Sequence, residues 1–345
     1  MFGKRKRTSV GIDVGSSLIK VVELEGIPKN PKIVRFGMTS LPSHAIVDGD
    51  IMDREAVIDA IKSLIESLGI EETEVVSAVP GRGVIVKKIQ MDRMKESEAE
   101  EQIKWVAEQY ISFPIDEVVI DFEILNPEVG EDQMEVLLVA AKKEMVEGRL
   151  SLLREAGLEP IILDVPAFAI QNVYEFNYEP DPQELIGMIH VGAQFTNITF
   201  IQGPVNHFTR DIPTSLTTLS QNLQRELGLP SEETFALIRG EGVENVDQAS
   251  FKMAVNNFFE DIAVGIERVL PYLPEGVERV QRIVLSGGGA LLPELPEFLK
   301  ERFGAEVEIL DPFKKIEYEE GIFETEPAKI APIAALSIGL AIRGE

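Results

Sequence analysis

The sequence predicts an α/β protein built from two similar lobes. Strand patterns alternate with helical patterns along 345 residues, a length typical of about two domains. A strand, a glycine turn and a second strand open the chain, and the same order returns near its middle. Aligning Asp13-Val14-Gly15 with His190-Val191-Gly192 places Lys20 on Asn197. A motif that occurs twice predicts two lobes facing each other across a cleft.

The first of these motifs, residues 10–24, has the features of a phosphate-binding loop. Two apolar runs are joined by Gly15-Ser16-Ser17, and glycine lets the backbone approach a ligand without a Cβ in the way. The serines offer hydroxyls and backbone N–H donors, Lys20 supplies a cation, and Asp13 could hold a hydrated metal ion. Taken alone, the stretch is explained more simply as an ordinary hairpin.

Composition excludes several classes of protein. The net charge of −26 argues against binding to nucleic acid, because phosphates would be repelled. The absence of cysteine excludes disulfides and thiolate metal sites, and three histidines are too few for a histidine-rich site. No signal peptide is visible, and the longest apolar stretch, residues 331–342, is shorter than the ~20 residues that span a bilayer. We therefore expect a soluble, cytoplasmic protein.

Periodicity locates the elements of the first half. After the opening hairpin we expect a strand at 32–38, a loop at 44–53, a helix at 54–68 and a strand at 74–79. Residues 84–163 then read as a compact α+β module with strands at 84–89, 118–125, 134–140 and 159–164 and helices at 96–111 and 145–156. Trp105 lies off the apolar stripe of its helix, so it should face a second surface.

The second half repeats this alternation. We expect a helix at 166–176, strands at 185–192, 194–201 and 207–212, helices at 213–227, 231–239 and 248–270, a strand at 280–285, a helix at 295–303, a strand at 307–310 and a final helix at 331–342. Three glycine turns follow apolar strands: Gly15-Ser16-Ser17, Gly192-Ala193-Gln194 and Gly287-Gly288-Gly289. Two hairpins could clamp phosphates from opposite sides, while the triple-glycine turn could pass close to a purine ring.

This order of motifs resembles the actin-like ATPase superfamily, and within it the type IV pilus assembly protein PilM family. The resemblance is carried by residues 10–24, 76–89, 103–122, 163–175, 208–212, 283–293 and 332–344. Residues 103–122 are the most specific of these, because they lie in the inserted module and not in the shared nucleotide core.

The resemblance implies an actin-like ATPase fold: two lobes with duplicated mixed five-stranded sheets and an inserted small α+β subdomain. The core of lobe 1 would comprise residues 1–83 and 164–184, and the inserted subdomain residues 84–163. The core of lobe 2 would comprise residues 185–212 and 280–345, with the last helix returning to lobe 1. Residues 213–279 would form a second subdomain of lobe 2.

The resemblance also implies MgATP in the cleft. The first phosphate loop would contain Asp13, Gly15, Ser16, Ser17 and Lys20, with Asp13 holding Mg through water. The second loop would contribute Gly192, Gln194 and Thr196, and the adenosine motif would be Gly287, Gly288 and Gly289. Arg268 would lie beside the adenine and ribose, and Gln171 would orient the attacking water.

Several residues depart from the family pattern. His190 stands where an aspartate normally helps to hold hydrated Mg²⁺, and Pro213-Thr214-Ser215 replaces a glycine pair. Gly265 occupies the place of a glutamate expected near the ribose, for which Asp261, one helical turn earlier, could substitute. We therefore expect ATP binding with weak or absent hydrolysis.

The resemblance further implies a partner and a location. Such proteins bind the N-terminal cytoplasmic peptide of PilN, partly through the inserted subdomain, and link it to the pilus motor ATPase and platform proteins that serve twitching motility. The protein would lie at the cytoplasmic face of the inner membrane, attached through partners and without nucleic acid, with homo-oligomers as a further expectation. The alternatives are a pseudo-ATPase scaffold, an FtsA-like cell-division protein and a small-molecule kinase, which would need a carboxylate base.

Overall fold

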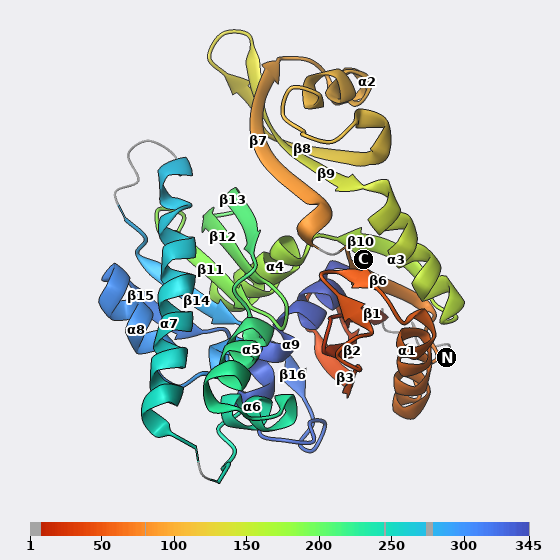
Figure 1. Cartoon of the computed structure of the whole chain (residues 1–345). Coiled ribbons are helices and arrows are strands. Elements are labelled where there is room, and N and C mark those ends of the chain that lie inside the picture. Colours follow the sequence, from red (N-terminus) through yellow and green to blue (C-terminus); the bar gives the residue numbers. More distant parts are fainter. Residues whose placement is uncertain (1–7, 80, 245, 274–278, 345) are drawn as a thin grey trace.

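Two mixed sheets with the same strand order form the centre of the molecule (Figure 1). The computed structural model describes residues 8–79, 81–244, 246–273 and 279–344. The first sheet has the order β10-β6-β1-β2-β3-β16 and the second the order β13-β12-β11-β14-β15. We call the parts built on these sheets lobe 1 and lobe 2. In each lobe the central strand, β1 or β11, is the first of three antiparallel strands on one side. On its other side it pairs in parallel with β6 or β14, which in turn pairs in parallel with β10 or β15.

The strands of lobe 1 are β1 (Thr8–Val14), β2 (Leu18–Glu25), β3 (Lys32–Ser40), β6 (Glu74–Ala78), β10 (Glu159–Asp164) and the short β16 (Glu317–Tyr318). Those of lobe 2 are β11 (Leu185–Val191), β12 (Thr196–Gln202), β13 (Val205–Ile212), β14 (Arg282–Ser286) and β15 (Glu306–Ile309). The predicted duplication is confirmed at the level of register, because Asp13 pairs with Lys20 and His190 pairs with Asn197. The one departure from five strands is β16, which adds a sixth strand to the edge of β3.

A third sheet, of order β7-β9-β8, stands apart from the other two. It is formed by β7 (Val84–Asp92), β8 (Val118–Val129) and β9 (Gln133–Lys142), and α2 (Glu96–Ala107) packs on it through Ala99 and Ile103. Figure 1 shows this unit projecting from the end of the molecule that carries α3 and β10. From here on, the inserted subdomain means residues 84–142.

The predicted end of the insertion, at residue 163, was wrong. Helix α3 (Lys143–Glu155) buries Leu152 and Leu153 in the core of lobe 1, and β10 pairs in parallel with β6 of the first sheet. The periodicity located both elements correctly. It could not tell which sheet would accept the strand, because a half-buried strand has the same pattern beside either neighbour.

Two helices lie between the sheets and join the lobes. They are α4 (Pro166–Tyr178) and α9 (Pro327–Arg343), and one core cluster combines their apolar residues with those of both sheets, such as Leu24 and Met188. Their axes approach closely, because a Cβ at Gly339 of α9 would lie 1.9 Å from the backbone oxygen of Ala169 of α4. The lobes therefore share a continuous apolar core.

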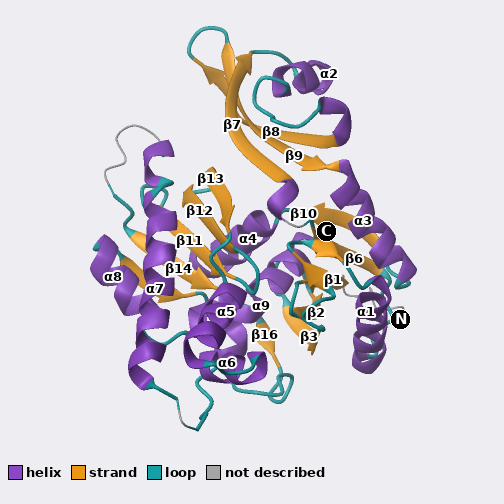
Figure 2. Cartoon of the chain, viewed as in Figure 1, coloured by secondary structure: helices purple, strands orange, loops and turns teal. Residues whose placement is uncertain are grey.

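The remaining elements cover the outer faces (Figure 2). They are the small hairpin β4 (Ile46–Val47) and β5 (Asp50–Ile51), where a loop had been expected, α1 (Arg54–Leu68), α5 (Leu216–Leu227), α6 (Ser231–Ile238), α7 (Gln248–Glu267) and α8 (Leu295–Phe303). Short 3₁₀ turns are η1 (Gly81–Gly83), η2 (Ile115–Glu117), η3 (Leu270–Tyr272) and η4 (Gly288–Leu291). Among the residues described, no helix combines the length and the apolar character needed to span a bilayer.

Candidate functional site

The first hairpin, β1–β2, brings together the residues expected to form the first phosphate loop. The Lys20 ammonium lies 2.6 Å from a carboxylate oxygen of Asp13, and both side chains are largely buried. The Gly15 amide donates to the Leu18 carbonyl and closes the turn. A Cβ at Gly15 would lie 2.9 Å from that same oxygen, so this position has no space for a side chain. Within the described chain, the hydroxyls of Ser16 and Ser17 make no hydrogen bond and remain available to a ligand.

The second hairpin, β11–β12, closes in the same way. The Gly192 amide donates to the Phe195 carbonyl, and a Cβ at Gly192 would lie 2.8 Å from that oxygen. The first turn of α5 begins directly beside it, since the Leu216 amide donates to the Gly192 carbonyl. The two hairpins therefore share geometry as well as sequence pattern.

Two side chains of the second hairpin have structural partners. Thr196 is fully buried and its hydroxyl donates to the Thr214 carbonyl at 2.7 Å, so it does not fit the expected side-chain contact with a ligand. The Gln194 amide nitrogen donates to the Ile46 carbonyl at 2.7 Å, which fastens this turn to lobe 1. Sequence pattern could not anticipate either contact, because both depend on how distant segments pack.

The triple-glycine turn, residues 287–289, packs against the end of β11. Gly287 has a φ of 80°, and its Cβ would lie 2.4 Å from the Val191 carbonyl oxygen. A Cβ at Gly289 would lie 2.2 Å from a Val191 methyl carbon, whereas Gly288 is half-exposed and faces Leu216 of α5. Side chains at Gly287 and Gly289 would push the turn away from the second hairpin, so the glycines hold these two loops together.

The two hairpins lie close enough for their charges to interact. The pKa of His190 is lowered from 6.5 to about 4, chiefly by burial and also by the Lys20 ammonium of the opposite lobe, while the Asp13 carboxylate opposes the shift. His190 Nδ1 lies 3.0 Å from the Ser286 hydroxyl. At neutral pH the imidazole is therefore uncharged, and it does not repel a cation held near Asp13.

Other contacts hold the lobes together beside the hairpins. The Arg82 guanidinium lies 5.5 Å from the centre of the Phe195 ring, and Gly81 packs so tightly on Asp211 that a Cβ would lie 2.0 Å from its carboxylate oxygen. Burial raises the pKa of Asp211, and the hydrogen bond from Asn197 opposes that change. These contacts link the two lobes beside the candidate site.

Gln171 does not lie at this site. Its side-chain nitrogen donates to Glu175 at 2.7 Å and to the Pro204 carbonyl at 3.1 Å, and its oxygen accepts from Asn206 at 3.3 Å. Pro204 lies in the β12–β13 turn and Asn206 near the start of β13, about 20 Å, or some seven residues, from the phosphate end of those strands. The expected role of Gln171 in orienting water is therefore not compatible with its position.

Arg268 caps the C-terminal end of α7 and is exposed. One turn earlier, a Cβ at Gly265 would lie 2.5 Å from Ile212 Cδ1, so α7 approaches the sheet too closely there for the glutamate of the family pattern. This packing gives a physical reason for the departure at Gly265. The placing of Arg268 beside an adenine stays a prediction.

Arg149 is the residue of this region that sequence reasoning missed. It comes from α3, is 6% exposed, and its Nη1 lies 3.4 Å from the carbonyl oxygen of Val14 in the first hairpin. Burial lowers the pKa of Arg149 to about 10, and Asp13 opposes that shift. A signal was present, because Val146, Leu152 and Leu153 place Arg149 on the apolar face of its helix.

Asp164, at the end of β10, is a second buried charge that the sequence did not single out. One carboxylate oxygen accepts from the Val165 amide at 2.7 Å, and burial raises the pKa of the side chain. Arg343 lies 3.8 Å from the other oxygen. This pair links the C-terminal end of α9 to β10 of lobe 1.

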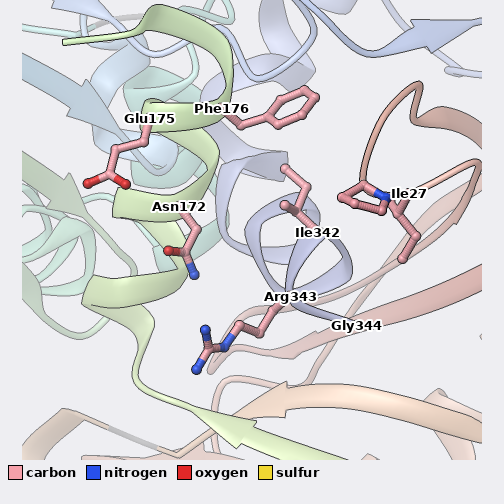
Figure 3. A pocket seen from close by; sticks show the side chains of 8 residues that line it. Ile27, Asn172, Glu175, Phe176, Ile342, Arg343 and Gly344 are labelled. Carbon is pink, nitrogen blue, oxygen red and sulfur yellow. The ribbon is translucent and has the colours of Figure 1, made fainter. Parts of the chain in front are cut away.

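A cavity of about 480 Å³ lies apart from the hairpins. Figure 3 shows Asn172, Glu175 and Phe176 on one side of it and Ile342, Arg343 and Gly344 on the other, and Ile27 and Pro28 complete its lining. It adjoins the start of β1, because Gly344 packs against Ser9, whereas the hairpin turn follows the end of that strand. This cavity is therefore distinct from the candidate nucleotide site.

Comparison with known proteins identifies the family. The family model described as type IV pilus assembly protein PilM matches residues 11–345. The chain belongs to the PilM family. Within this family, a solved PilM-PilN type IV pilus biogenesis complex contains a chain that is 29% identical, with a TM-score of 0.87 over 97% of the present chain and 98% of that chain. The actin-like ATPase fold predicted from the sequence is confirmed.

Two more distant proteins place the PilM family among actin-like proteins. Cell division protein FtsA of Streptococcus pneumoniae serotype 2 (strain D39 / NCTC 7466) is 26% identical over 356 residues, covering 88% of the present chain and 75% of its own length. MreB5 of Spiroplasma citri, solved bound to AMPPNP, is 13% identical with a TM-score of 0.58 over 97% of the present chain and 95% of its own. At that identity the second likeness concerns the fold alone.

Proposed function

We propose that this PilM-family protein is an ATP-binding adaptor of type IV pilus assembly, with MgATP held between the two hairpins. The observation that carries the proposal is the pair of matching glycine hairpins, one from each lobe, with Asp13 and Lys20 of the first near enough to act on the pKa of His190 in the second. The likeness to MreB5 bound to AMPPNP supports it, because that protein shares the fold.

The residues present fit this ligand. Gly15 and Gly192 leave the backbone of both turns open to close approach, and the free hydroxyls of Ser16 and Ser17 can donate to phosphate oxygens. Lys20 would exchange its contact with Asp13 for a phosphate, which frees the Asp13 carboxylate to hold water molecules around Mg²⁺. The metal ion would offset phosphate charge. The half-exposed Gly288 and the exposed Arg268 remain the residues proposed to border the adenosine.

Binding is favoured over hydrolysis. His190 is a neutral imidazole where relatives of this fold carry a carboxylate, and Gln171 is engaged at the far end of β12 and β13. Hydrolysis needs a group that orients the attacking water, and the residue expected to do so is too distant. We propose weak or absent ATP hydrolysis. A scaffold that has lost nucleotide binding altogether is the competing function.

We further propose that the inserted subdomain takes part in binding the N-terminal peptide of PilN. The likeness to the PilM-PilN complex supports PilN as a partner. On the inserted subdomain, Trp105 of α2 is 73% exposed and Val119 of β8 is 44% exposed. Exposed aromatic residues are frequent anchors of protein interfaces. Links to the motor ATPase and platform proteins, a place at the cytoplasmic face of the inner membrane and homo-oligomers belong to the same proposal.

Isothermal titration calorimetry with MgATP tests the nucleotide site. We expect saturable binding to the wild type and at least tenfold weaker binding to Asp13→Ala, since a charge-assisted contact contributes roughly 1.5–3 kcal/mol. Asp121→Ala, at an exposed position of the inserted subdomain, is the matched control and should bind as the wild type does. A folded wild-type protein that releases no heat at millimolar MgATP would favour the scaffold.

A synthetic peptide with the N-terminal sequence of PilN tests the interface. We expect Trp105→Ala to weaken binding by about tenfold or more, in line with the loss of an aromatic anchor. Met253→Ala removes an exposed apolar side chain from α7 of lobe 2 and should leave binding unchanged. Equal affinities for the wild type and Trp105→Ala would remove Trp105 from the interface.

A further inference from the structure

Helix α3 connects the inserted subdomain rigidly to lobe 1. It starts at Lys143, directly after the last residue of β9, with no loop between them. At its N-terminal end the Lys143 ammonium donates to the Asp116 carbonyl of the inserted subdomain. Near its C-terminal end Arg54 of α1 donates to Ser151 and Glu155 at 2.7 Å. Displacement of α3 would therefore also displace the inserted sheet.

Arg149 lies between these two attachments and extends to the first hairpin. A guanidinium has five N–H donors. The only hydrogen bond of Arg149 within the described residues is the long one, 3.4 Å, from Nη1 to the Val14 carbonyl, and its buried Nε has no partner there. An arginine that served only the fold would be expected to have its buried donors satisfied, since unpaired donors cost free energy.

The charges beside the first hairpin sum to one positive charge. Asp13 contributes one negative charge, Lys20 and Arg149 contribute two positive charges, and His190 is neutral at neutral pH, while the Asp211 carboxylate is bound by Asn197 of the second hairpin. This local excess of positive charge occurs in a chain whose net charge is −26. A buried excess charge is costly unless a counter-ion accompanies it, so the arrangement fits an anion bound beside the first hairpin.

We propose that Arg149 is a positioning residue that makes the inserted subdomain respond to the polyphosphate bound between the hairpins. The inference rests on the proposed nucleotide site. When Lys20 turns from Asp13 to a phosphate, Arg149 is the remaining cationic side chain that acts on the Asp13 carboxylate and contacts the Val14 carbonyl. A stronger contact there draws the middle of α3 toward the hairpin. Strand β9 moves with the helix, because it leads into α3 without a loop between them. Nucleotide binding and peptide binding on the inserted subdomain would then be coupled.

Hydrogen–deuterium exchange of the full chain, with and without saturating MgATP, tests this coupling. In the wild type we expect slower exchange in both hairpins, residues 10–24 and 190–197, together with altered exchange across residues 84–142. In Arg149→Met we expect MgATP affinity to fall by about tenfold. At saturation its hairpins should still be protected, while the response of residues 84–142 is lost.

Arg154→Met is the matched control. Arg154 lies on the same helix, but it is exposed and pairs with Glu159 at 3.0 Å. This variant should respond to MgATP as the wild type does in both places. Methionine approximates the length of the arginine side chain without its charge, so Arg149→Met should fold. Should it not fold, Arg149→Lys keeps the charge but loses the planar fork, and a reduced response of residues 84–142 is then expected.

Two results would overturn the inference. The inference alone is overturned if Arg149→Met responds to MgATP in residues 84–142 as the wild type does, because the nucleotide would then bind without this coupling. Where the methionine variant does not fold, the same result for Arg149→Lys would overturn it. A wild type in which MgATP protects neither hairpin would overturn both the nucleotide site and the inference that depends on it.

Discussion

At the scale of single residues, the site depends on how buried charges are balanced. Asp13 and Lys20 pair across the first hairpin, and His190 sits opposite them as a neutral base. The sequence indicated Asp13 and Lys20 through their alternation around a glycine turn. Helical spacing places Arg149 on the apolar face of α3, but it could not show that Arg149 extends to the first hairpin or that Gln171 bonds to a distant turn. Contacts between segments far apart in the chain are not encoded in local spacing.

The protonation of His190 makes one prediction about stability. Its pKa in the folded protein is about 4, below the ordinary 6.5, so the unfolded chain binds a proton first as the pH falls. The free energy of unfolding should therefore decrease as the pH drops from 6.5 toward 4. Glutamine does not titrate, so between pH 6.5 and 4 the free energy of unfolding of His190→Gln should fall by about 1–2 kcal/mol less than that of the wild type.

Urea denaturation of both proteins at a series of pH values, without nucleotide, measures this difference. Parallel profiles for the wild type and His190→Gln would mean that folding does not lower the pKa of His190.

At the scale of elements, the close approach of α4 and α9 determines how the lobes are joined. Helical periodicity indicated both helices, and strand periodicity indicated β10, but neither pattern specified the neighbours of these elements. The sequence therefore predicts β10 and α3 in the inserted subdomain, whereas the structure places them in lobe 1. The glycine turns were recognisable because backbone approach requires glycine, a constraint that is visible in the sequence itself.

Two glycine-to-alanine substitutions in helices should have opposite effects. Gly339→Ala would place a methyl group 1.9 Å from the Ala169 carbonyl oxygen, so the helices must separate, and we expect a loss of about 1–3 kcal/mol. Gly148→Ala on α3 meets nothing within 4 Å and should raise stability by about 0.5–1 kcal/mol through helix propensity. Chemical denaturation measures both. A stable Gly339→Ala would show that α4 and α9 can shift apart without loss.

At the scale of the whole molecule, the lobes are joined on one side and face each other on the other. Helices α4 and α9 form a shared apolar core with both sheets, while contacts such as Gln194 with Ile46 and Arg82 with Phe195 close the hairpin side. Because the apolar core joins the lobes on one side, the contacts on the hairpin side can change when a ligand binds while the lobes stay connected. The duplicated order of strands predicted this arrangement. The position of the inserted sheet came from the structure.

The most direct test of the two-hairpin site is a crystal structure of the protein grown with Mg²⁺ and AMPPNP. The account predicts density for the triphosphate between Gly15-Ser16-Ser17 and Gly192-Ala193-Gln194, with Lys20 turned from Asp13 to a phosphate oxygen. Triphosphate density in any other part of the molecule, or a Lys20–Asp13 pair unchanged beside a bound nucleotide, would contradict it.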